Sequence, residues 1–223
     1  MELCDENLLQ YVIRNKKEFK PEEILKIMTQ LNNTFKIMKE NNIIHRNIKL
    51  ENILVKYKDE EKKDYIVKLT DYGVSKILMS LSKKCNTHAG TISTMAPEIF
   101  EEEGENEYNY KCDLWSIGII IYRLLFKESP YPGQTERAIL NKIKTLGSES
   151  LKKTENKELD DLIEKLLEKD PKKRLDWEQY FNHPFFNPTK KESKNESNKE
   201  TKKNLRMNLR MNLRMNLRMN MRY

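Results

Sequence analysis

The sequence predicts a mainly α fold that also contains one small β-hairpin. Apolar residues after Pro21 recur at spacings of three and four, which is typical of a helix with one buried face. Two short β-prone runs lie between residues 53 and 69 with a charged segment between them, which predicts two strands joined by a turn. The segments after residue 111 add further helical patterns. One domain followed by a tail is expected for a chain of 223 residues.

The first expected helix begins at Pro21 and ends near Asn41. A proline in the first turn, followed by Glu22 and Glu23, suits a helix N-terminus. The apolar positions fall on one side of this helix, and we expect them to pack in the core: Ile24, Ile27, Met28, Leu31, Phe35 and Met38.

The expected hairpin pairs residues 53–57 with residues 65–69. Asp71-Tyr72-Gly73 comes next, and the long polar stretch after it, as far as His88, lacks periodicity, which predicts a loop. Residues 112–126 are apolar on all sides, so this helix is placed in the core. Residues 135–146 and 158–167 have amphipathic spacing. Asp176 is a suitable N-cap for a last short helix that ends near His183.

Charge and composition divide the chain into three parts. Lys and Arg number 42 against 35 Asp and Glu, but residues 189–223 hold 11 of the basic and only 3 of the acidic groups. Residues 1–187 are therefore expected to form the folded domain. Residues 188–203 have the charged composition of a disordered linker. Residues 204–223 form a basic tail that repeats Asn-Leu-Arg-Met.

Three interpretations of the basic tail stay open. It is a simple repeat expansion without a role, a segment that binds polyanions or acidic membranes through its arginines, or a docking motif. Elsewhere, Cys4, Cys85 and Cys112 form no C-x-x-C pair and suggest no metal site. No signal peptide begins the sequence and no apolar run could span a bilayer. We expect an intracellular protein, in the cytoplasm rather than the nucleus.

Five short motifs occur in a fixed order along residues 45–174. They are His45-Arg46-Asn47-Ile48-Lys49-Leu50-Glu51-Asn52, Asp71-Tyr72-Gly73, Ala96-Pro97-Glu98, Asp113-Leu114-Trp115-Ser116-Ile117-Gly118, and Arg174 after Asp170-Pro171. Together they resemble the serine/threonine protein kinase family, and the first motif resembles the catalytic loop of that family. The resemblance covers residues 1–187 and implies the large helical C-terminal lobe of a kinase-like α+β fold.

The resemblance implies a nucleotide site that uses ATP and Mg²⁺. Asn52 and Asp71 match the positions that hold Mg²⁺ in the family. Lys49 matches the lysine beside the transferring phosphoryl group, and a lysine there resembles the serine/threonine class. Met1-Glu2-Leu3-Cys4 resembles the hinge between the two kinase lobes, so Glu2 and Cys4 are expected beside the nucleotide, with Leu54 beneath the adenine ring.

The resemblance also implies supporting roles for other matched positions. Glu98 and Arg174 resemble the family's buried ion pair, and Asp113 would accept backbone N–H groups from the catalytic loop. Arg46 could receive a phosphate on Ser80, Ser82 or Thr87. The remaining supporting positions are His45, Tyr72, Gly73 and Thr91. His88 and His183 match no motif and are expected to be structural.

Two departures argue against catalysis. Asn47 replaces the aspartate that accepts the substrate hydroxyl proton, and an amide has no basic lone pair near neutral pH. No glycine-rich G-x-G-x-x-G loop occurs in the sequence, and the hinge-like start predicts that the smaller lobe is absent. Weak or absent binding of ATP and Mg²⁺ is expected, since half a site leaves the nucleotide in water.

Three hypotheses follow. The first is a catalytically impaired kinase-like module, or pseudokinase, that binds a protein partner over the exposed apolar surface near Met1, Leu3 and Leu54. The second is an active serine/threonine kinase whose smaller lobe is encoded upstream. The third is a gene fragment without function.

Overall fold

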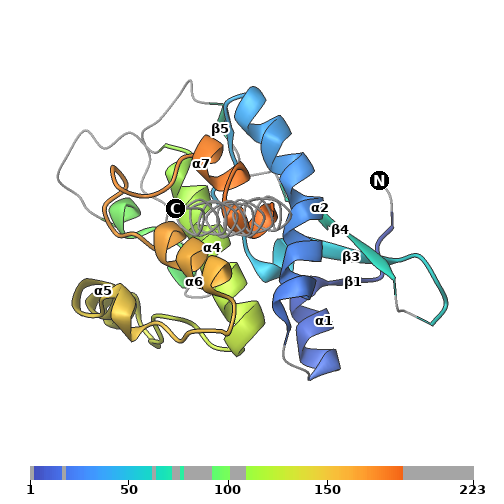
Figure 1. Ribbon diagram of the computed structural model, residues 1–223, viewed down its shortest axis with the longest axis horizontal. Helices are drawn as coiled ribbons and strands as arrows, with labels where there is room; N and C mark the ends of the chain where they lie inside the picture. The colour runs from blue at the N-terminus through green and yellow to red at the C-terminus, as the bar shows by residue number, and fades with distance from the viewer. Residues whose placement is uncertain are drawn as a thin grey trace, which may run out of the picture. The chain divides into compact units, whose positions relative to one another are not determined.

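The computed structural model describes residues 3–16, 19–61, 64–71, 92–100 and 109–187, together with the backbone of residues 76–77. The chain divides into two units, Met1–Phe185 and Phe186–Tyr223. The expected linker and basic tail, residues 188–223, lie outside the described residues. All of the helices and strands labelled in Figure 1 belong to the first unit.

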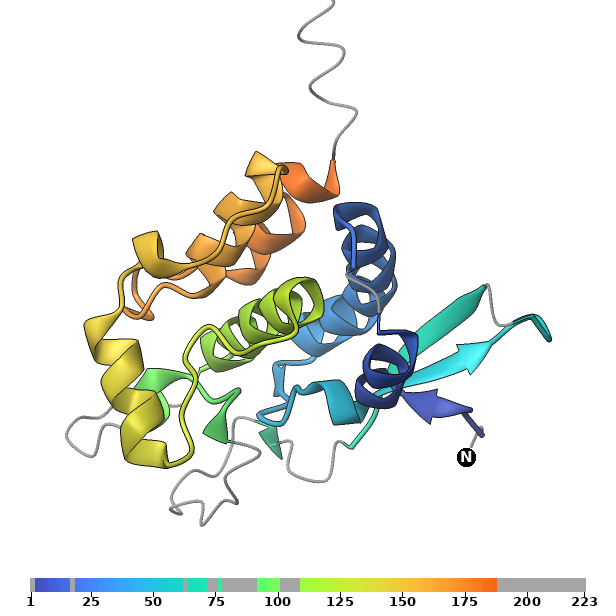
Figure 2. The ribbon, with the colours of Figure 1, turned by 90° about the horizontal axis from the view of Figure 1, so that it is seen from below.

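Helix α4 (Lys111–Phe126) is the central element of this unit. Its side chains are buried on every side from Cys112 to Leu125, apart from Arg123, as the uniformly apolar sequence predicts. It lies between α2 (Pro21–Glu40) and α6 (Lys157–Leu166), as Figure 2 shows. Gly118 makes the second contact close, because a Cβ added there would lie 2.9 Å from the Leu166 Cβ.

The buried face of α2 confirms the predicted stripe. All six apolar positions are buried, and Asn32 joins them by accepting a hydrogen bond from the Tyr180 hydroxyl at 2.9 Å. The helix starts with Pro21 in its first turn and ends at Glu40, close to the predicted limits. It packs against strand β4 of the small sheet.

The predicted hairpin is present with the expected limits. Strands β3 (Ile53–Tyr57) and β4 (Tyr65–Leu69) run antiparallel, with Ile53 opposite Leu69 and Tyr57 opposite Tyr65. A third strand, β1 (Glu6–Asn7), pairs antiparallel with β3 and was not predicted. The sheet order is β1-β3-β4.

Two further elements differ from the sequence-based expectation. Helix α1 (Leu8–Asn15) was missed, although Asn7 and Gln10 form a reciprocal capping box at its start. The loop expected after Asp71 contains a short strand, β5 (Lys76–Ile77), which pairs antiparallel with β2 (Ile43–Ile44). Strands of two residues carry no periodic pattern, so these pairings had no signal in the sequence.

The later helices follow the predicted pattern and are capped by side chains. Thr135 caps α5 (Glu136–Thr145), and Asn156 caps α6. Asp176 caps α7 (Trp177–Phe181), as predicted, and forms a capping box with Gln179. Short 3₁₀ turns complete the described elements: η1 (Leu50–Asn52), η3 (Pro97–Ile99), η4 (Ser148–Ser150) and η5 (Pro184–Phe186). Within the described residues, no helix has the length and apolar character needed to cross a membrane.

Candidate catalytic-loop site

Residues 45–52 resemble the catalytic loop of the kinase family and are called the catalytic loop below; they connect β2 to β3 and end in the 3₁₀ turn η1. Helix α1 packs against η1. Two residues of the site have left-handed backbone, Arg46 with φ 67° and Asp71 with φ 66°. Residues other than glycine adopt this backbone conformation at an energetic cost, which the surrounding contacts must offset.

Asp113 fixes the start of the catalytic loop from below. Its two carboxylate oxygens accept the backbone N–H groups of His45 and Arg46, each at 2.8 Å. Complete burial raises the pKa of Asp113 to about 6, although the two hydrogen bonds and the Arg46 charge favour the ionised carboxylate. The contact expected from the sequence is therefore present, and it joins α4 to the catalytic loop.

His45 holds the same loop through both ring nitrogens. The ring is fully buried, and burial lowers its pKa, so the neutral form is favoured. Nε2 lies 3.0 Å from the Thr70 carbonyl oxygen, while Nδ1 accepts the Asn47 backbone N–H at 3.3 Å. One tautomer satisfies both contacts, with the proton on Nε2.

Asn47, Asn52 and Asp71 meet at one point, as the sequence motifs predict. The Asn47 side-chain amide donates to Asp71 Oδ2 at 3.0 Å. The Asn52 amide donates to the same oxygen at 3.3 Å and to the Asn47 backbone carbonyl at 2.8 Å. This set of three residues, the Asn–Asp cluster, is held together by hydrogen bonds among its own members.

The residues expected around an adenine ring are placed only in part. Strand β1 brings the chain beside β3, and the Asp5 N–H donates to the Val55 carbonyl at 3.0 Å. Cys4 and Leu54 are both half-buried on these neighbouring segments. Lys49 is half-buried directly before η1. The other predicted positions lie outside the described residues: Glu2, Tyr72, Gly73, Ser80, Ser82, Thr87, His88 and Thr91.

The predicted ion pair between Glu98 and Arg174 is present and bidentate. The two guanidinium nitrogens lie 2.6 and 2.9 Å from the Glu98 carboxylate oxygens, and the Arg174 side chain has no solvent exposure. The guanidinium also donates to three backbone carbonyls, those of Lys111, Glu168 and Lys169. Together these contacts form the Glu98–Arg174 network.

Sequence reasoning missed two supports of this network. The Arg174 guanidinium lies 5.0 Å from the centre of the Trp115 ring, a cation–π contact. The Ser116 hydroxyl donates to the Thr94 carbonyl at 2.8 Å and fastens the segment before η3 to α4. Both residues stand in the Asp113 motif, but the sequence does not show which atoms they contact.

The Asn–Asp cluster fits Mg²⁺ in the chemistry of its donors. Amide and carboxylate oxygens are the ligands that this hard cation prefers. Among the described residues, however, no group of three or more His, Cys, Asp and Glu side chains could hold a metal. Within the Asn–Asp cluster, the charged donor is Asp71, since Asn47 and Asn52 are neutral.

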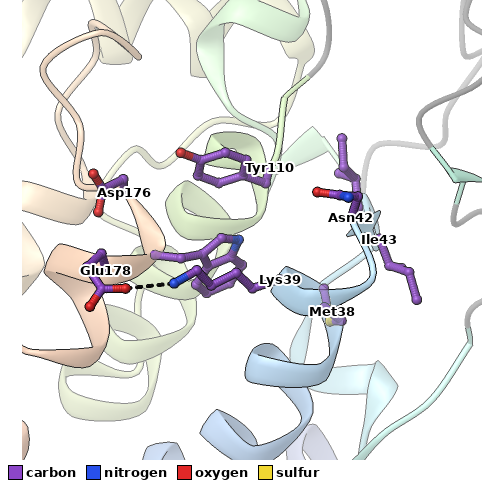
Figure 3. Close-up of a pocket in the computed structure, with 9 residues that line it drawn as sticks. Met38, Lys39, Asn42, Ile43, Tyr110, Asp176 and Glu178 are labelled. Atoms are coloured by element: carbon purple, nitrogen blue, oxygen red, sulfur yellow. Dashed lines mark hydrogen bonds and ion pairs between the residues drawn. The ribbon is translucent and has the colours of Figure 1, made fainter.

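A separate pocket of about 340 Å³ lies between the end of α2, strand β2 and the start of α7 (Figure 3). Lys39 and Glu178 form an ion pair of 2.7 Å at its rim. Tyr110 and Trp177 stack in its wall with ring centres 6.3 Å apart. None of the predicted site residues lines it.

The Asp113 carboxylate that holds the catalytic loop and the Glu98–Arg174 network together are the arrangement of a kinase-like domain. The model of the protein kinase domain matches residues 1–186, and the chain belongs to this family. The family generally uses ATP and Mg²⁺.

Several relatives are named serine/threonine-protein kinases. Serine/threonine-protein kinase atg1 of Dictyostelium discoideum is 33% identical over 187 residues, which cover 84% of this chain and 27% of that protein. Serine/threonine-protein kinase ppk11 of Schizosaccharomyces pombe is 34% identical over 186 residues, or 83% of this chain and 57% of the relative. The chain thus spans between about a quarter and three fifths of the length of these two relatives.

Proposed function

We propose that residues 1–187 form the large helical lobe of a serine/threonine protein kinase domain whose phosphotransfer is impaired, and that it acts by binding a protein partner. The observation that carries this proposal is the hydrogen bond that the Asn47 side-chain amide donates to Asp71. Asn47 occupies the proton-acceptor position of the catalytic loop.

The loss of the acceptor affects rate more than positioning. A general base contributes about 10²–10⁴ in rate. Phosphoryl transfer has a loose transition state in which positioning and electrostatics dominate. Asn47 could orient a substrate hydroxyl only if its side-chain oxygen, which is buried, became accessible, and it cannot remove the proton. Slow transfer or none is therefore expected.

The residues around Asn47 have the chemistry for the rest of the site. The Lys49 ammonium would neutralise charge that develops on the transferring phosphoryl group. Asn52 and Asp71 would hold Mg²⁺, which when bound supplies positive charge to the nucleotide phosphates. Glu2, Cys4 and Leu54 would contact the adenine. With Asn47 bonded to Asp71, we expect binding of ATP and Mg²⁺ to be weak or absent.

A protein partner is expected on the apolar surface near the start of the chain. Leu3 is 89% exposed and is the most exposed of the large apolar side chains in the described part. Such surfaces mark interaction sites. The basic tail, residues 204–223, is proposed to contact polyanions or acidic membranes through its five arginines. Binding of the full chain to heparin at low salt, absent in a chain ending at residue 187, would support the second contact.

A phosphotransfer assay tests the impairment. The chain is incubated with Mg-ATP and a serine- and threonine-rich acceptor protein, beside the Asp71→Ala variant as the inactive control. Transfer at the level of Asp71→Ala is expected. A rate more than about 10²-fold above that control, the low end of a general-base contribution, would overturn the proposal.

That outcome would favour a second candidate, an active serine/threonine kinase. The preserved Lys49 and the complete Glu98–Arg174 network favour it. The relatives are also serine/threonine kinases. Under this candidate, Asn47→Asp would raise transfer further.

A further inference from the structure

The Asp71 carboxylate meets two amide donors where a cation would be expected. Asp71 Oδ2 lies 3.0 Å from Asn47 Nδ2 and 3.3 Å from Asn52 Nδ2. Hydrogen bonds to an ionised acceptor are among the stronger ones in proteins. The partial positive charge of these N–H groups therefore compensates the carboxylate without a metal ion.

The orientation of Asn47 shows that this contact dominates its placement. Within the described part of the molecule, Asn47 Oδ1 is buried without a hydrogen-bond partner. A buried acceptor left unsatisfied is unfavourable. Turning the amide over would bring that oxygen against Asp71 Oδ2, which is also an acceptor. The side chain thus keeps its N–H on the carboxylate at the expense of its own oxygen.

Asn52 is oriented in the same way. Its NH₂ group donates to the Asn47 carbonyl at 2.8 Å and points at Asp71. A cation shared by Asn52 and Asp71 needs the Asn52 oxygen on that side. The cation would therefore have to displace the hydrogen bonds that the Asn52 amide makes to Asn47 and Asp71.

An aspartate at position 47 would place a negative charge beside Asp71 in place of the Asn47 N–H donor. Two carboxylates about as close as the present 3.0 Å contact would repel each other. A divalent cation relieves such repulsion and gains attraction from a second negative charge. The difference between the two residues is therefore a difference in cation affinity as well as in proton acceptance.

We propose that Asn47 is the residue that sets the divalent-cation affinity of this site. Its amide serves as a built-in counter-charge to Asp71, so the site is stable without a cation and binds Mg²⁺ weakly. The inference rests on the proposed assignment of Asn52 and Asp71 as the cation ligands.

Cation binding without nucleotide tests the inference. The full chain and its Asn47→Asp variant are titrated with MgCl₂ by calorimetry and with Mn²⁺ by electron paramagnetic resonance. Asn141→Asp, on the exposed side of α5, adds the same charge far from the site and serves as the matched control. Asn47→Asp should bind at least about 10-fold more tightly, the scale of effects on metal affinity from neighbouring groups. Asn141→Asp should bind like the parent chain.

Thermal unfolding gives a second readout. In a chelator, Asn47→Asp should melt below the parent chain, and Mg²⁺ should restore it. If that variant does not fold, Asn47→Ala carries the test, because it removes the competing donor without adding charge. Its Mg²⁺ affinity should exceed that of the parent chain.

Equal cation affinity in the folded Asn47 variants and the parent chain would overturn the inference. It would leave the proposed impairment of phosphotransfer in place, because that rests on the missing proton acceptor. Conversely, fast phosphotransfer by the parent chain would overturn the proposed function, and the cation titrations would still decide the role of Asn47.

Discussion

The Glu98–Arg174 network and the Asn–Asp cluster respond to sequence change in different ways. In the first, a guanidinium without solvent exposure is held by a bidentate carboxylate and three carbonyls. In the second, three side chains meet at an oxygen that water can approach, since the Asn47–Asp71 bond is exposed. We expect the fold to depend on the first set and the proposed chemistry to depend on the second.

Under the proposed function, the difference explains how asparagine can occupy the proton-acceptor position while the fold is kept. Asparagine has the same shape as aspartate, and the side-chain N–H of Asn47 donates a hydrogen bond to the Asp71 carboxylate. No charge is left stranded in the interior. A change of Glu98, by contrast, would leave the buried Arg174 charge without its carboxylate partner.

The largest expected effect is therefore on the ion pair. Glu98→Ala leaves the Arg174 charge without its carboxylate, and breaking a buried pair in this way destabilises by about 3–5 kcal/mol. Urea unfolding measures the change. The control is Glu178→Ala, which removes the exposed Lys39–Glu178 pair and should cost much less, because solvent screens an exposed pair. Equal losses in the two variants would contradict the comparison.

The next effect concerns pH and Asp113. Burial raises its pKa from 3.8 to about 6 in the folded chain. The folded state then holds the proton more tightly, so this contribution to stability is complete below pH 3.8 and is lost as the pH rises through 6. The loss amounts to about 3 kcal/mol, at 1.36 kcal/mol per unit. Asp113→Asn removes the titration.

Unfolding of the parent chain and of Asp113→Asn at pH 4 and pH 7 isolates this term. The destabilisation caused by Asp113→Asn should be larger at the lower pH. A difference that is independent of pH would show that the carboxylate is ionised throughout the range.

A smaller effect tests the packing beneath both regions. Gly118→Ala places a Cβ 2.9 Å from atoms of Leu166 and Leu167, so α4 and α6 must move apart. Overpacking of this kind costs about 1–3 kcal/mol. A variant as stable as the parent would mean that the two helices separate without loss.

The smallest effect is expected in the Asn–Asp cluster. Asn47→Ala removes one hydrogen bond to a carboxylate, which contributes about 1.5 kcal/mol, the low end for a charged acceptor, because this bond is exposed. Thermal unfolding in a chelator measures it. A loss as large as that of Glu98→Ala would place Asn47 among the residues on which the fold depends.

Much of this architecture could be predicted from the sequence. The stripe of α2, the buried α4 and the β3–β4 hairpin each span enough residues to show a period. Helix α1 and the β2–β5 pair were missed, because their signals are a short capping pattern and two-residue strands.

The site was predictable only as a set of positions. Motif order placed Asn47, Asn52 and Asp71 together, but it did not show which atom donates to which. That depends on the left-handed backbone at Arg46 and Asp71 and on contacts between residues 24 positions apart. The Trp115–Arg174 contact likewise arises only when α4 and the segment after α6 pack.

Thermal unfolding of the full chain with and without Mg-ATP tests the central claim most directly. A ligand at 100 times its dissociation constant stabilises by about 2.7 kcal/mol, and each kcal/mol shifts the melting temperature of a domain of this size by about 2–4 °C. The account predicts no shift at millimolar Mg-ATP, because Asp71 is bonded to Asn47. A stabilisation of several degrees that Asp71→Ala abolishes would contradict it.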